Sequence, residues 1–225
     1  MTASEPTSSN GRARGQPIAV IDYGVNNVGS VLNMFRRIGV EAIAVRHATA
    51  LAGSSAVVLP GIGAFDAGVK SLRERGLFEA IRASVLDART PILGICLGMQ
   101  LLGAGSEEGS LEGLGLLAAT ARRLTVDREI PRLKVPHMGW NRTECLDREL
   151  FAALEAPRFY FVHSYHVVCE DPSDVAARCV YGAPFTAAVR RGPIMGTQFH
   201  PEKSHRFGMR VLENFAALVA AGHHA

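Results

Sequence analysis

The sequence predicts an α/β fold, a single three-layer domain around a central, mostly parallel sheet with antiparallel additions in the second half. Three observations lead to this prediction. As far as residue 105, short β-branched runs alternate with segments of helical periodicity, which is typical of a parallel sheet with helices on both faces. From residue 116 to 199, strand signals follow one another with few helical ones between them. No Pro-, Gly- or Ser-rich linker divides the 225 residues, so one core accounts for the chain.

The first half is expected to supply the parallel strands and their helices. Residues 28–38 carry apolar side chains at helical spacing and end at Gly39, which predicts a helix there. The stretch 65–86 predicts one broken helix or two short ones, and 99–104 a further helix. The expected strands are 18–22, 42–45, 56–59 and 92–95.

The second half is expected to add antiparallel strands and to close with a helix over 206–221. Residues 1–16 are rich in Ser, Thr, Gly and Arg and lack the apolar core of a secretory signal. We expect a disordered tail there, with a transit peptide as the alternative, and the folded domain over 17–225. The expected strands are 121–126, 159–168, 176–181, 186–189 and 194–198.

The composition excludes several classes of function. A net charge of +3, with arginine pairs scattered along the chain, argues against a nucleic-acid interface. No apolar stretch reaches the length of a membrane span. The four cysteines show no C-x-x-C spacing, which argues against a zinc site. We therefore expect a cytoplasmic protein with reduced thiols and no metal or cofactor.

Cys96 is the candidate nucleophile. It lies in Gly94-Ile-Cys-Leu-Gly98, between a strand signal and a helical segment, and this is the cysteine counterpart of the G-x-S-x-G nucleophile elbow. The flanking glycines allow the sharp turn without Cβ clashes. Free N–H groups of a helix that begins just after Cys96 would favour the thiolate. A small buried core cysteine is the alternative, but a core strand has no need of the two glycines.

His200 and Glu202 are the candidate base and orienting acid. A cysteine nucleophile needs both, close in space but not in sequence. His200 follows the strand signal 194–198 and would emerge at a strand end, where sites in α/β folds form. Pro201 biases His200 toward an extended conformation, and Glu202 can then bond one ring nitrogen while the other faces the thiol. The His-x-Glu spacing also occurs in zinc deaminases, but their P-C-x-x-C partner is missing here.

The loop 59–65 is the candidate oxyanion-binding segment. Gly61-Ile-Gly63 lies between a strand and a helix, as a glycine-rich anion-binding loop would. A dinucleotide fingerprint is the alternative, but Asp66 stands where its third glycine should be. We expect the backbone N–H groups of Gly63 and Leu97 to form a two-donor oxyanion hole.

These motifs resemble the class I, or triad, glutamine amidotransferases. Gly94-Ile-Cys-Leu-Gly-Met-Gln100 and Phe199-His-Pro-Glu202 match the motifs of that family without substitution, and the resemblance runs from about residue 18 to 217. Within the family, the chain is similar to the glutaminase subunits of imidazole glycerol phosphate synthases of histidine biosynthesis. Three further segments carry that similarity: Asp22-Tyr-Gly-Val-Asn-Asn27, Lys134-Val-Pro-His-Met-Gly-Trp-Asn141 and Tyr160-Phe-Val-His-Ser-Tyr165.

The resemblance implies a substrate, a partner and further site residues. It implies that glutamine is hydrolysed through a γ-glutamyl thioester on Cys96, and that Gln100 and the backbone of Ser164 and Tyr165 hold the substrate. The partner implied is a separate (β/α)₈ cyclase, bound as a heterodimer, which uses the ammonia to form imidazole glycerol phosphate and aminoimidazole carboxamide ribotide. The candidates for the docking face are Asn26, Asn27, Trp140 and Lys203.

Three alternatives stay open at this point. A subunit serving anthranilate or aminodeoxychorismate synthesis would share the elbow, so the run from Lys134 to Asn141 is the discriminating segment. A γ-glutamyl hydrolase or cysteine peptidase would share the triad but act without a partner. A non-catalytic α/β binding module would be expected to lack one of Cys96, His200 and Glu202, and all three are present.

Overall fold

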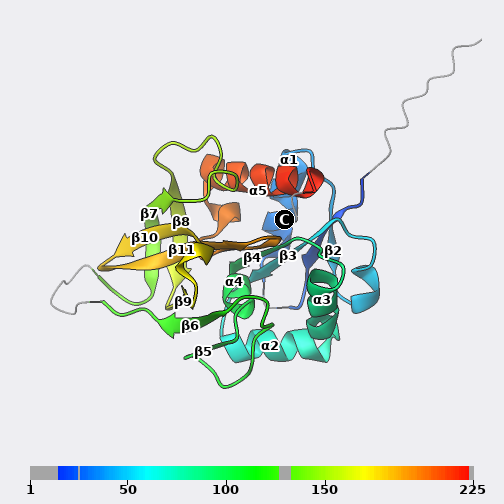
Figure 1. The fold of residues 1–225 in the computed structure, drawn as a ribbon, viewed down its shortest axis with the longest axis horizontal. Helices are drawn as coiled ribbons and strands as arrows, with labels where there is room; N and C mark the ends of the chain where they lie inside the picture. Colours follow the sequence, from blue (N-terminus) through cyan, green and yellow to red (C-terminus); the bar gives the residue numbers. More distant parts are fainter. Residues whose placement is uncertain (1–14, 25, 127–132, 223–225) are drawn as a thin grey trace, which may run out of the picture.

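The main sheet has nine strands and combines a parallel half with an antiparallel half (Figure 1). The computed structural model describes residues 15–24, 26–126 and 133–222. The strand order is β2-β1-β3-β4-β12-β11-β10-β7-β8; neighbours from β2 to β12 are parallel, and those from β12 to β8 antiparallel. The strands are β1 (Ile18–Ile21), β2 (Ala42–Val45), β3 (Ala56–Gly61), β4 (Ile92–Cys96), β7 (His137–Cys145), β8 (Arg158–His163), β10 (Val175–Tyr181), β11 (Ala183–Arg191) and β12 (Ile194–Thr197).

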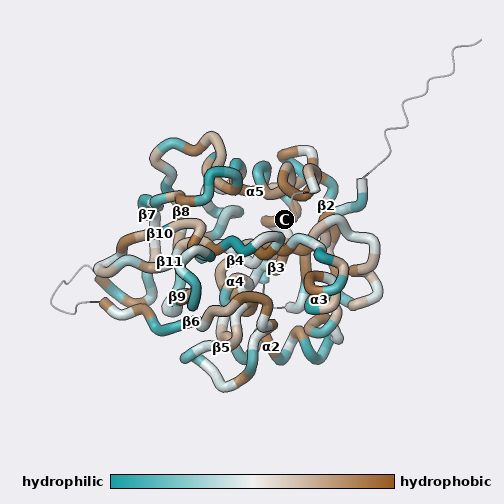
Figure 2. The backbone as a smooth tube through the Cα atoms, viewed as in Figure 1, coloured by the Kyte–Doolittle hydropathy of each residue, from teal (hydrophilic) through white to brown (hydrophobic). Residues whose placement is uncertain are grey.

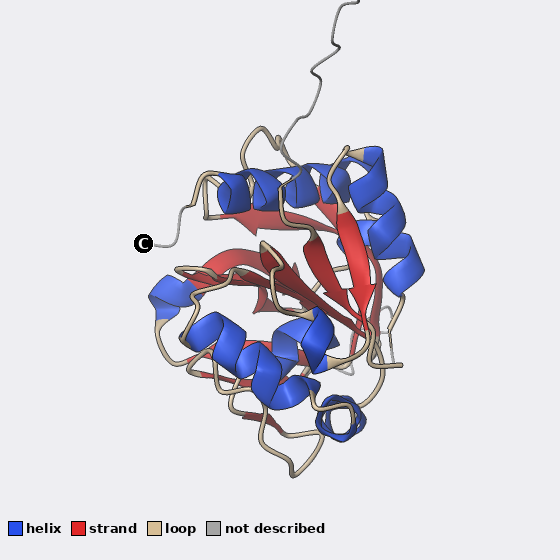
Figure 3. Ribbon diagram, turned by 90° about the vertical axis from the view of Figure 1, so that its right-hand side faces the viewer, coloured by secondary structure: helices blue, strands red, loops and turns tan. Residues whose placement is uncertain are grey.

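Helices cover both faces of this sheet, as Figure 3 shows. Five α-helices and three short 3₁₀ turns are described. They are α1 (Val28–Arg37), α2 (Phe65–Glu74), α3 (Leu77–Leu86), α4 (Leu97–Leu101), α5 (His205–Ala220), η1 (Ala48–Ala50), η2 (Pro172–Asp174) and η3 (Pro201–Lys203). A second, smaller sheet consists of β5 (Gly105–Ser106), β6 (Ala119–Arg123) and β9 (Tyr165–Cys169).

The core has two layers, one on each face of the sheet, because side chains alternate between the two faces along each strand. In β1, Ile18 and Val20 pack with α1 and α5 on one face, while Ala19 and Ile21 pack with α2, α3 and α4 on the other. Successive strand side chains point to opposite faces, so a strand buried on both sides must be apolar throughout. Hydrophilic residues recur along the outer helices α2 and α5 (Figure 2). The predicted three-layer α/β fold is confirmed.

Several predicted boundaries were wrong. The strand expected over 159–168 is two strands in different sheets, because the chain passes from β8 to β9 at Ser164. β7 was not predicted as a strand, since its outward side chains give it no clean apolar alternation. For 65–86, where one broken helix or two short ones were expected, the second alternative is correct: α2 and α3 are separated at Gly76 by a left-handed backbone conformation (φ 66°). Residues 1–14 of the expected tail lie outside the described residues.

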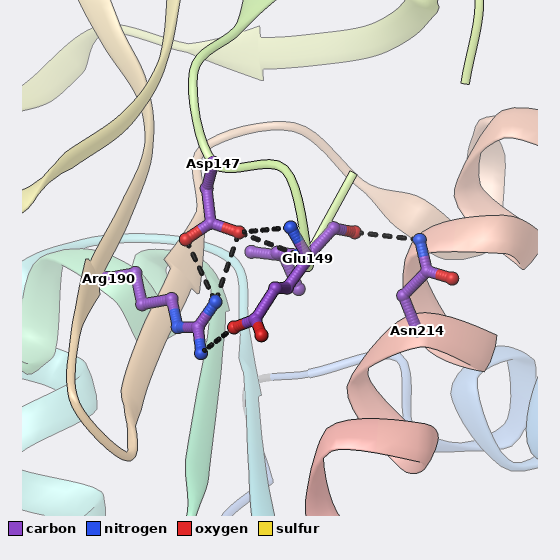
Figure 4. Close-up of polar contacts among 5 residues, drawn as sticks. Asp147, Glu149, Arg190 and Asn214 are labelled. Carbon is purple, nitrogen blue, oxygen red and sulfur yellow. Dashed lines mark hydrogen bonds and ion pairs between the residues drawn. The ribbon is translucent and has the colours of Figure 1, made fainter. Parts of the chain in front are cut away.

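A polar cluster ties the loop after β7 to β11 and α5 (Figure 4). The guanidinium of Arg190, on β11, donates to both carboxylate oxygens of Asp147 at 2.9 and 3.1 Å and lies 2.7 Å from the carboxylate of Glu149. From α5, the Asn214 amide donates to the carbonyls of Leu150 and Ala152 at 3.0 Å each. These contacts hold the loop where its apolar side chains enter the core. None of the helices described is long and apolar enough to cross a membrane.

Candidate active site

Cys96 lies at the junction of β4 and α4 in a strained backbone conformation. Its φ is +55°, a value that non-glycine residues seldom adopt and that occurs at functional sites. The turn requires close backbone approaches on both sides of the cysteine. A Cβ on Gly94 would come within 2.7 Å of the backbone of Gly98, and one on Gly98 would overlap the carbonyl oxygen of Leu59. The two glycines therefore permit the sharp turn, as expected from the motif.

His200 and Glu202 follow β12, which is hydrogen-bonded to β4 in parallel. The ring Nδ1 of His200 lies 2.8 Å from Oε1 of Glu202, and the two side chains are only 2% and 3% exposed. The backbone N–H of His200 donates to the carbonyl of Tyr160, and its own carbonyl accepts from the hydroxyl of Ser204 at 2.7 Å. Because the acid follows the base by two positions in the chain, the local backbone is enough to bring their side chains together.

Electrostatic contacts favour a charged imidazole at this position. Burial lowers the pKa of His200, but Cys96 and Glu202 more than offset it and raise the pKa to about 9. With Nδ1 on Glu202, the Nε2 atom is left to face the sulfur. Nε2 forms no hydrogen bond of normal geometry within the described residues, although the sulfur of Cys96 is close enough to raise the pKa of His200. Of these three residues, Cys96 ends β4, His200 directly precedes the η3 turn, and Glu202 lies within it.

A cavity of about 440 Å³ opens beside Cys96. Its lining residues come from the loop after β3, from α4 and from the β8–β9 junction. These segments are far apart in the sequence. Of the predicted residues, Gly63, Leu97, Gln100, Ser164 and Tyr165 all line it. Glu108 and His163 also line it and were missed, because neither lies in a segment with a recognisable catalytic pattern. Glu108 accepts a hydrogen bond from the N–H of Phe65 at the start of α2.

Comparison with known proteins agrees with this geometry. The family model described as "Glutamine amidotransferase class-I" matches residues 19–219. The chain belongs to this family. It is 48% identical over 204 residues to "Imidazole glycerol phosphate synthase subunit HisH 2" of Pseudomonas aeruginosa, covering 90% of this chain and 100% of that one. It is 44% identical over 200 residues to the protein of the same name in Methanococcus maripaludis, covering 88% and 98%.

Solved structures share the fold of this amidotransferase chain. A crystal structure of a glutamine amidotransferase superposes with a TM-score of 0.70 at 22% identity, covering 90% of this chain and 98% of that one. The crystal structure of a glutamine amidotransferase from Thermotoga maritima superposes with a TM-score of 0.63 at 19% identity, covering 92% and 85%. At these identities the likeness concerns the fold alone.

Hydrogen bonds link the amidotransferase cavity to a buried polar network. The carbonyl oxygen of Tyr165 accepts from Nε2 of Gln100 at 3.0 Å and lies 2.9 Å from Nδ1 of His163. Gln100 also donates to Oε1 of Gln198 at 3.2 Å, and Nε2 of Gln198 lies 3.7 Å from the sulfur of Cys96. Gln198 was missed by sequence reasoning, although it directly precedes the Phe199-His-Pro-Glu202 motif.

Two of the predicted docking residues lie on one exposed face of the amidotransferase. The ring of Trp140, 40% exposed, stacks on His205 at 5.3 Å and meets Tyr160 edge-on at 6.1 Å. The exposed Lys203 has its Nζ 5.9 Å from the centre of the Tyr160 ring. Asn26 and Asn27 precede α1, which contacts the η3 turn. The amide of Asn26 already donates to the carbonyl of Ile21 at 2.7 Å, so it also has a structural role.

Within residues 15–24, 26–126 and 133–222, no group of three or more His, Cys, Asp or Glu side chains could hold a metal ion. The four cysteines are free thiols. The arrangement can support acyl transfer, because a thiol and an imidazole held by a carboxylate lie together beside a cavity that Gly63 and Leu97 also line.

Proposed function

We propose that this chain is the glutaminase subunit of an imidazole glycerol phosphate synthase. It hydrolyses glutamine to glutamate and ammonia and delivers the ammonia to a separate cyclase subunit of histidine biosynthesis. The observation that carries the specific assignment is the 48% identity to the Pseudomonas aeruginosa subunit, which extends over the whole of that relative. The cavity beside Cys96 supports the glutaminase chemistry independently of that likeness.

In the first half of the reaction, the sulfur of Cys96 attacks the side-chain carbonyl carbon of glutamine. The carbonyl oxygen becomes an oxyanion, which accepts hydrogen bonds from the backbone N–H groups of Leu97 and Gly63. His200, which receives the thiol proton, donates a proton from Nε2 to the departing nitrogen. The carbon–nitrogen bond breaks, ammonia leaves, and a γ-glutamyl thioester remains on Cys96.

In the second half, water replaces ammonia beside His200. The imidazole takes a proton from the water, whose oxygen attacks the thioester carbon. The carbon–sulfur bond breaks, the proton returns to the sulfur, and glutamate leaves. Glu202 holds the ring in one tautomer and orientation through Nδ1, and its carboxylate stabilises the imidazolium that forms in each half.

The α-carboxylate and α-amino groups of glutamine need partners at the far end of the cavity. We assign them to Gln100 and to the backbone of Ser164 and Tyr165, all of which line it. Glu108 lines the same cavity and is exposed. Its carboxylate is suited to bind the α-ammonium group.

The partner in this proposal is a (β/α)₈ cyclase, bound as a heterodimer. Free ammonia is mostly protonated near neutral pH and is then not a nucleophile, so direct transfer between subunits preserves its reactivity. The exposed face around Trp140 and Lys203, with Asn26 and Asn27, is the docking surface that we propose. A cytoplasmic location belongs to the same proposal and fits the four free thiols.

A glutaminase assay with and without the cyclase and its nucleotide substrate tests the proposal. We expect low glutamate production by the chain alone and a rise of at least tenfold in the complex. Cys96→Ala should abolish glutamate production while the cyclase still turns over with added ammonium salt. Glutamine-dependent turnover by the Cys96→Ala complex would contradict the role of Cys96.

The assay also separates the alternatives. Full glutaminase activity without any partner would point to a γ-glutamyl hydrolase or peptidase. Stimulation by an anthranilate or aminodeoxychorismate synthase, but not by the cyclase, would assign the chain to a different synthase.

A further inference from the structure

Gln198 is a fully buried polar side chain (0% exposed) beside the reacting atom of the site. Its Nε2 atom lies 3.7 Å from the sulfur of Cys96, within the longer range of hydrogen bonds to sulfur. We propose that Gln198 is a further catalytic residue, whose amide N–H donates to the Cys96 sulfur and stabilises its thiolate form. The inference rests on the proposed function in that this thiolate is taken to be the nucleophile of the glutaminase reaction.

The direction of this hydrogen bond follows from a main-chain atom. The carbonyl oxygen of Tyr165 can only accept, so the group of Gln100 that lies 3.0 Å from it must be the NH₂. The nitrogen of the same NH₂ lies 3.2 Å from the side-chain amide of Gln198, and its second hydrogen requires the amide oxygen of Gln198 on that side. The NH₂ of Gln198 is then left for the sulfur. The chain of contacts excludes the flipped amide, in which an oxygen would face a thiolate.

The carbonyl oxygen of Tyr165 has a second hydrogen-bond partner, the ring of His163. Nδ1 of His163 lies 2.9 Å from the Tyr165 oxygen and must carry a hydrogen, so its Nε2 accepts from Nδ1 of His137 at 3.1 Å. Burial lowers the pKa of His163 to about 3 and that of His137 to about 4. Both rings therefore remain neutral through the physiological range, and the tautomers do not change there. The carbonyl that accepts from Gln100 thus also accepts from His163 on β8, and His163 is in turn held by His137 on β7.

Besides the imidazole of His200 and the buried phenol of Tyr23, both of which interact electrostatically with Cys96, the sulfur has two hydrogen-bonding neighbours of opposite kind. The carbonyl oxygen of Val162 lies 3.7 Å away and can accept from the thiol S–H. The amide of Gln198 can donate to the sulfur, and such a bond is stronger when the acceptor is charged. Val162 therefore favours the thiol and Gln198 the thiolate. Removing the donor leaves the thiol-stabilising contact intact and shifts the balance away from the nucleophilic form.

Alkylation of Cys96 by iodoacetamide tests the proposal without glutamine or a cyclase. The rate at Cys96 is followed by peptide mass spectrometry between pH 5 and 9, in the full chain and in two variants. Gln198→Met keeps the volume and removes both polar ends, whereas Gln198→Glu keeps the acceptor for Gln100 and removes the donor to sulfur. We expect about a tenfold slower reaction at pH 7 for Gln198→Met and a larger loss for Gln198→Glu, because a carboxylate would face the thiolate.

Asn214→Leu is the matched control. It removes a side-chain amide with two hydrogen bonds from α5, so it should lower the melting temperature and leave the Cys96 alkylation rate within about twofold. If Gln198 acted only through packing, the Gln198→Met variant, which keeps the volume, would react as fast as the unaltered protein. Wild-type alkylation rates in both folded Gln198 variants would overturn the proposal.

A measurement on the unaltered protein covers the case in which neither variant folds. The side-chain amide signals of Gln198 in a ¹⁵N-correlated NMR spectrum should shift when Cys96 is alkylated, and those of Gln16 should not. An unmoved Gln198 amide would refute the hydrogen bond. If Gln198 passes these tests while no glutamine is hydrolysed, the proposed function fails and the thiolate donor stands.

Discussion

The replacement Glu202→Gln tests whether the carboxylate beside His200 acts through its charge. The amide keeps the volume of the side chain and removes the negative charge from its position 2.8 Å from Nδ1. Burial lowers the pKa of His200, and its contacts with Cys96 and Glu202 raise the pKa from 6.5 to about 9. The replacement should therefore weaken the preference for the imidazolium and affect both stability and catalysis.

The size of the effect on stability follows from this shift. The gap between 6.5 and about 9 corresponds to roughly 3 kcal/mol at about 1.4 kcal/mol per pKa unit. Both side chains are almost fully buried, so solvent screens the contact little. Since Glu202 is one of two partners that raise the pKa, its charge accounts for about 1–2 kcal/mol, or a fall in melting temperature of roughly 3–6 °C for a domain of this size.

The raised pKa of His200 also determines how this contribution to stability changes with pH. The folded state of the unaltered protein binds a proton more tightly than the unfolded chain does, so this contribution to stability is fully present below pH 6.5 and is lost as the pH rises through 9. The deficit of the variant should therefore be largest at pH 6 and small at pH 9.5.

Thermal unfolding at pH 6, 7.5 and 9.5 measures this deficit, with the exposed Glu112→Gln as control. In the activated complex the same Glu202→Gln change should lower kcat by on the order of 10⁴-fold, as the corresponding acid-to-amide change does in other triads. A deficit that is equal at pH 6 and pH 9.5 would refute the electrostatic reasoning, even if activity is lost.

Three further predictions concern the elbow, the fold and the interface. Gly98→Ala places a Cβ on the carbonyl oxygen of Leu59, so it should destabilise the protein by about 1–3 kcal/mol and lower glutaminase activity at least tenfold. The control is Gly29→Ala, which has open space around its Cβ and should change neither stability nor activity. Arg190→Met leaves two carboxylates without their cation and should cost about 2 kcal/mol in a denaturation experiment while the Cys96 alkylation rate is unchanged. Lys203→Ala should weaken cyclase affinity and ammonia transfer with little change in melting temperature; unchanged affinity and transfer would remove Lys203 from the proposed interface.

The features that could be predicted from the sequence are those that local pattern determines. The glycines around Cys96 permit a sharp turn between a strand and a helix, and Glu202 reaches His200 because only Pro201 separates them. The order of parallel strands with intervening helices likewise depends on short-range periodicity. These features carried the prediction of the fold class and of the candidate nucleophile, base and acid.

Other features depend on contacts that only the folded chain creates. Gln198 and Cys96 are 102 residues apart and meet because β12 lies beside β4. The break at Ser164 arises because the chain leaves one sheet for another there, and the residues on either side are equally typical of strands. Glu108 has no motif of its own, and the fold alone brings it to the cavity. Sequence periodicity contains no information on these neighbours.

The acceptor shared by Gln100 and His163 is the main-chain carbonyl of residue 165, and every amino acid has such a carbonyl. Substitutions of the Tyr165 side chain that keep the course of β9 should leave both hydrogen bonds in place, so natural or engineered diversity at this position is compatible with an unchanged network. Comparisons of residue identity among relatives would therefore fail to detect this acceptor. Chemical synthesis offers direct access to it: an ester in place of the amide between residues 165 and 166 weakens the carbonyl as an acceptor and alters no side chain.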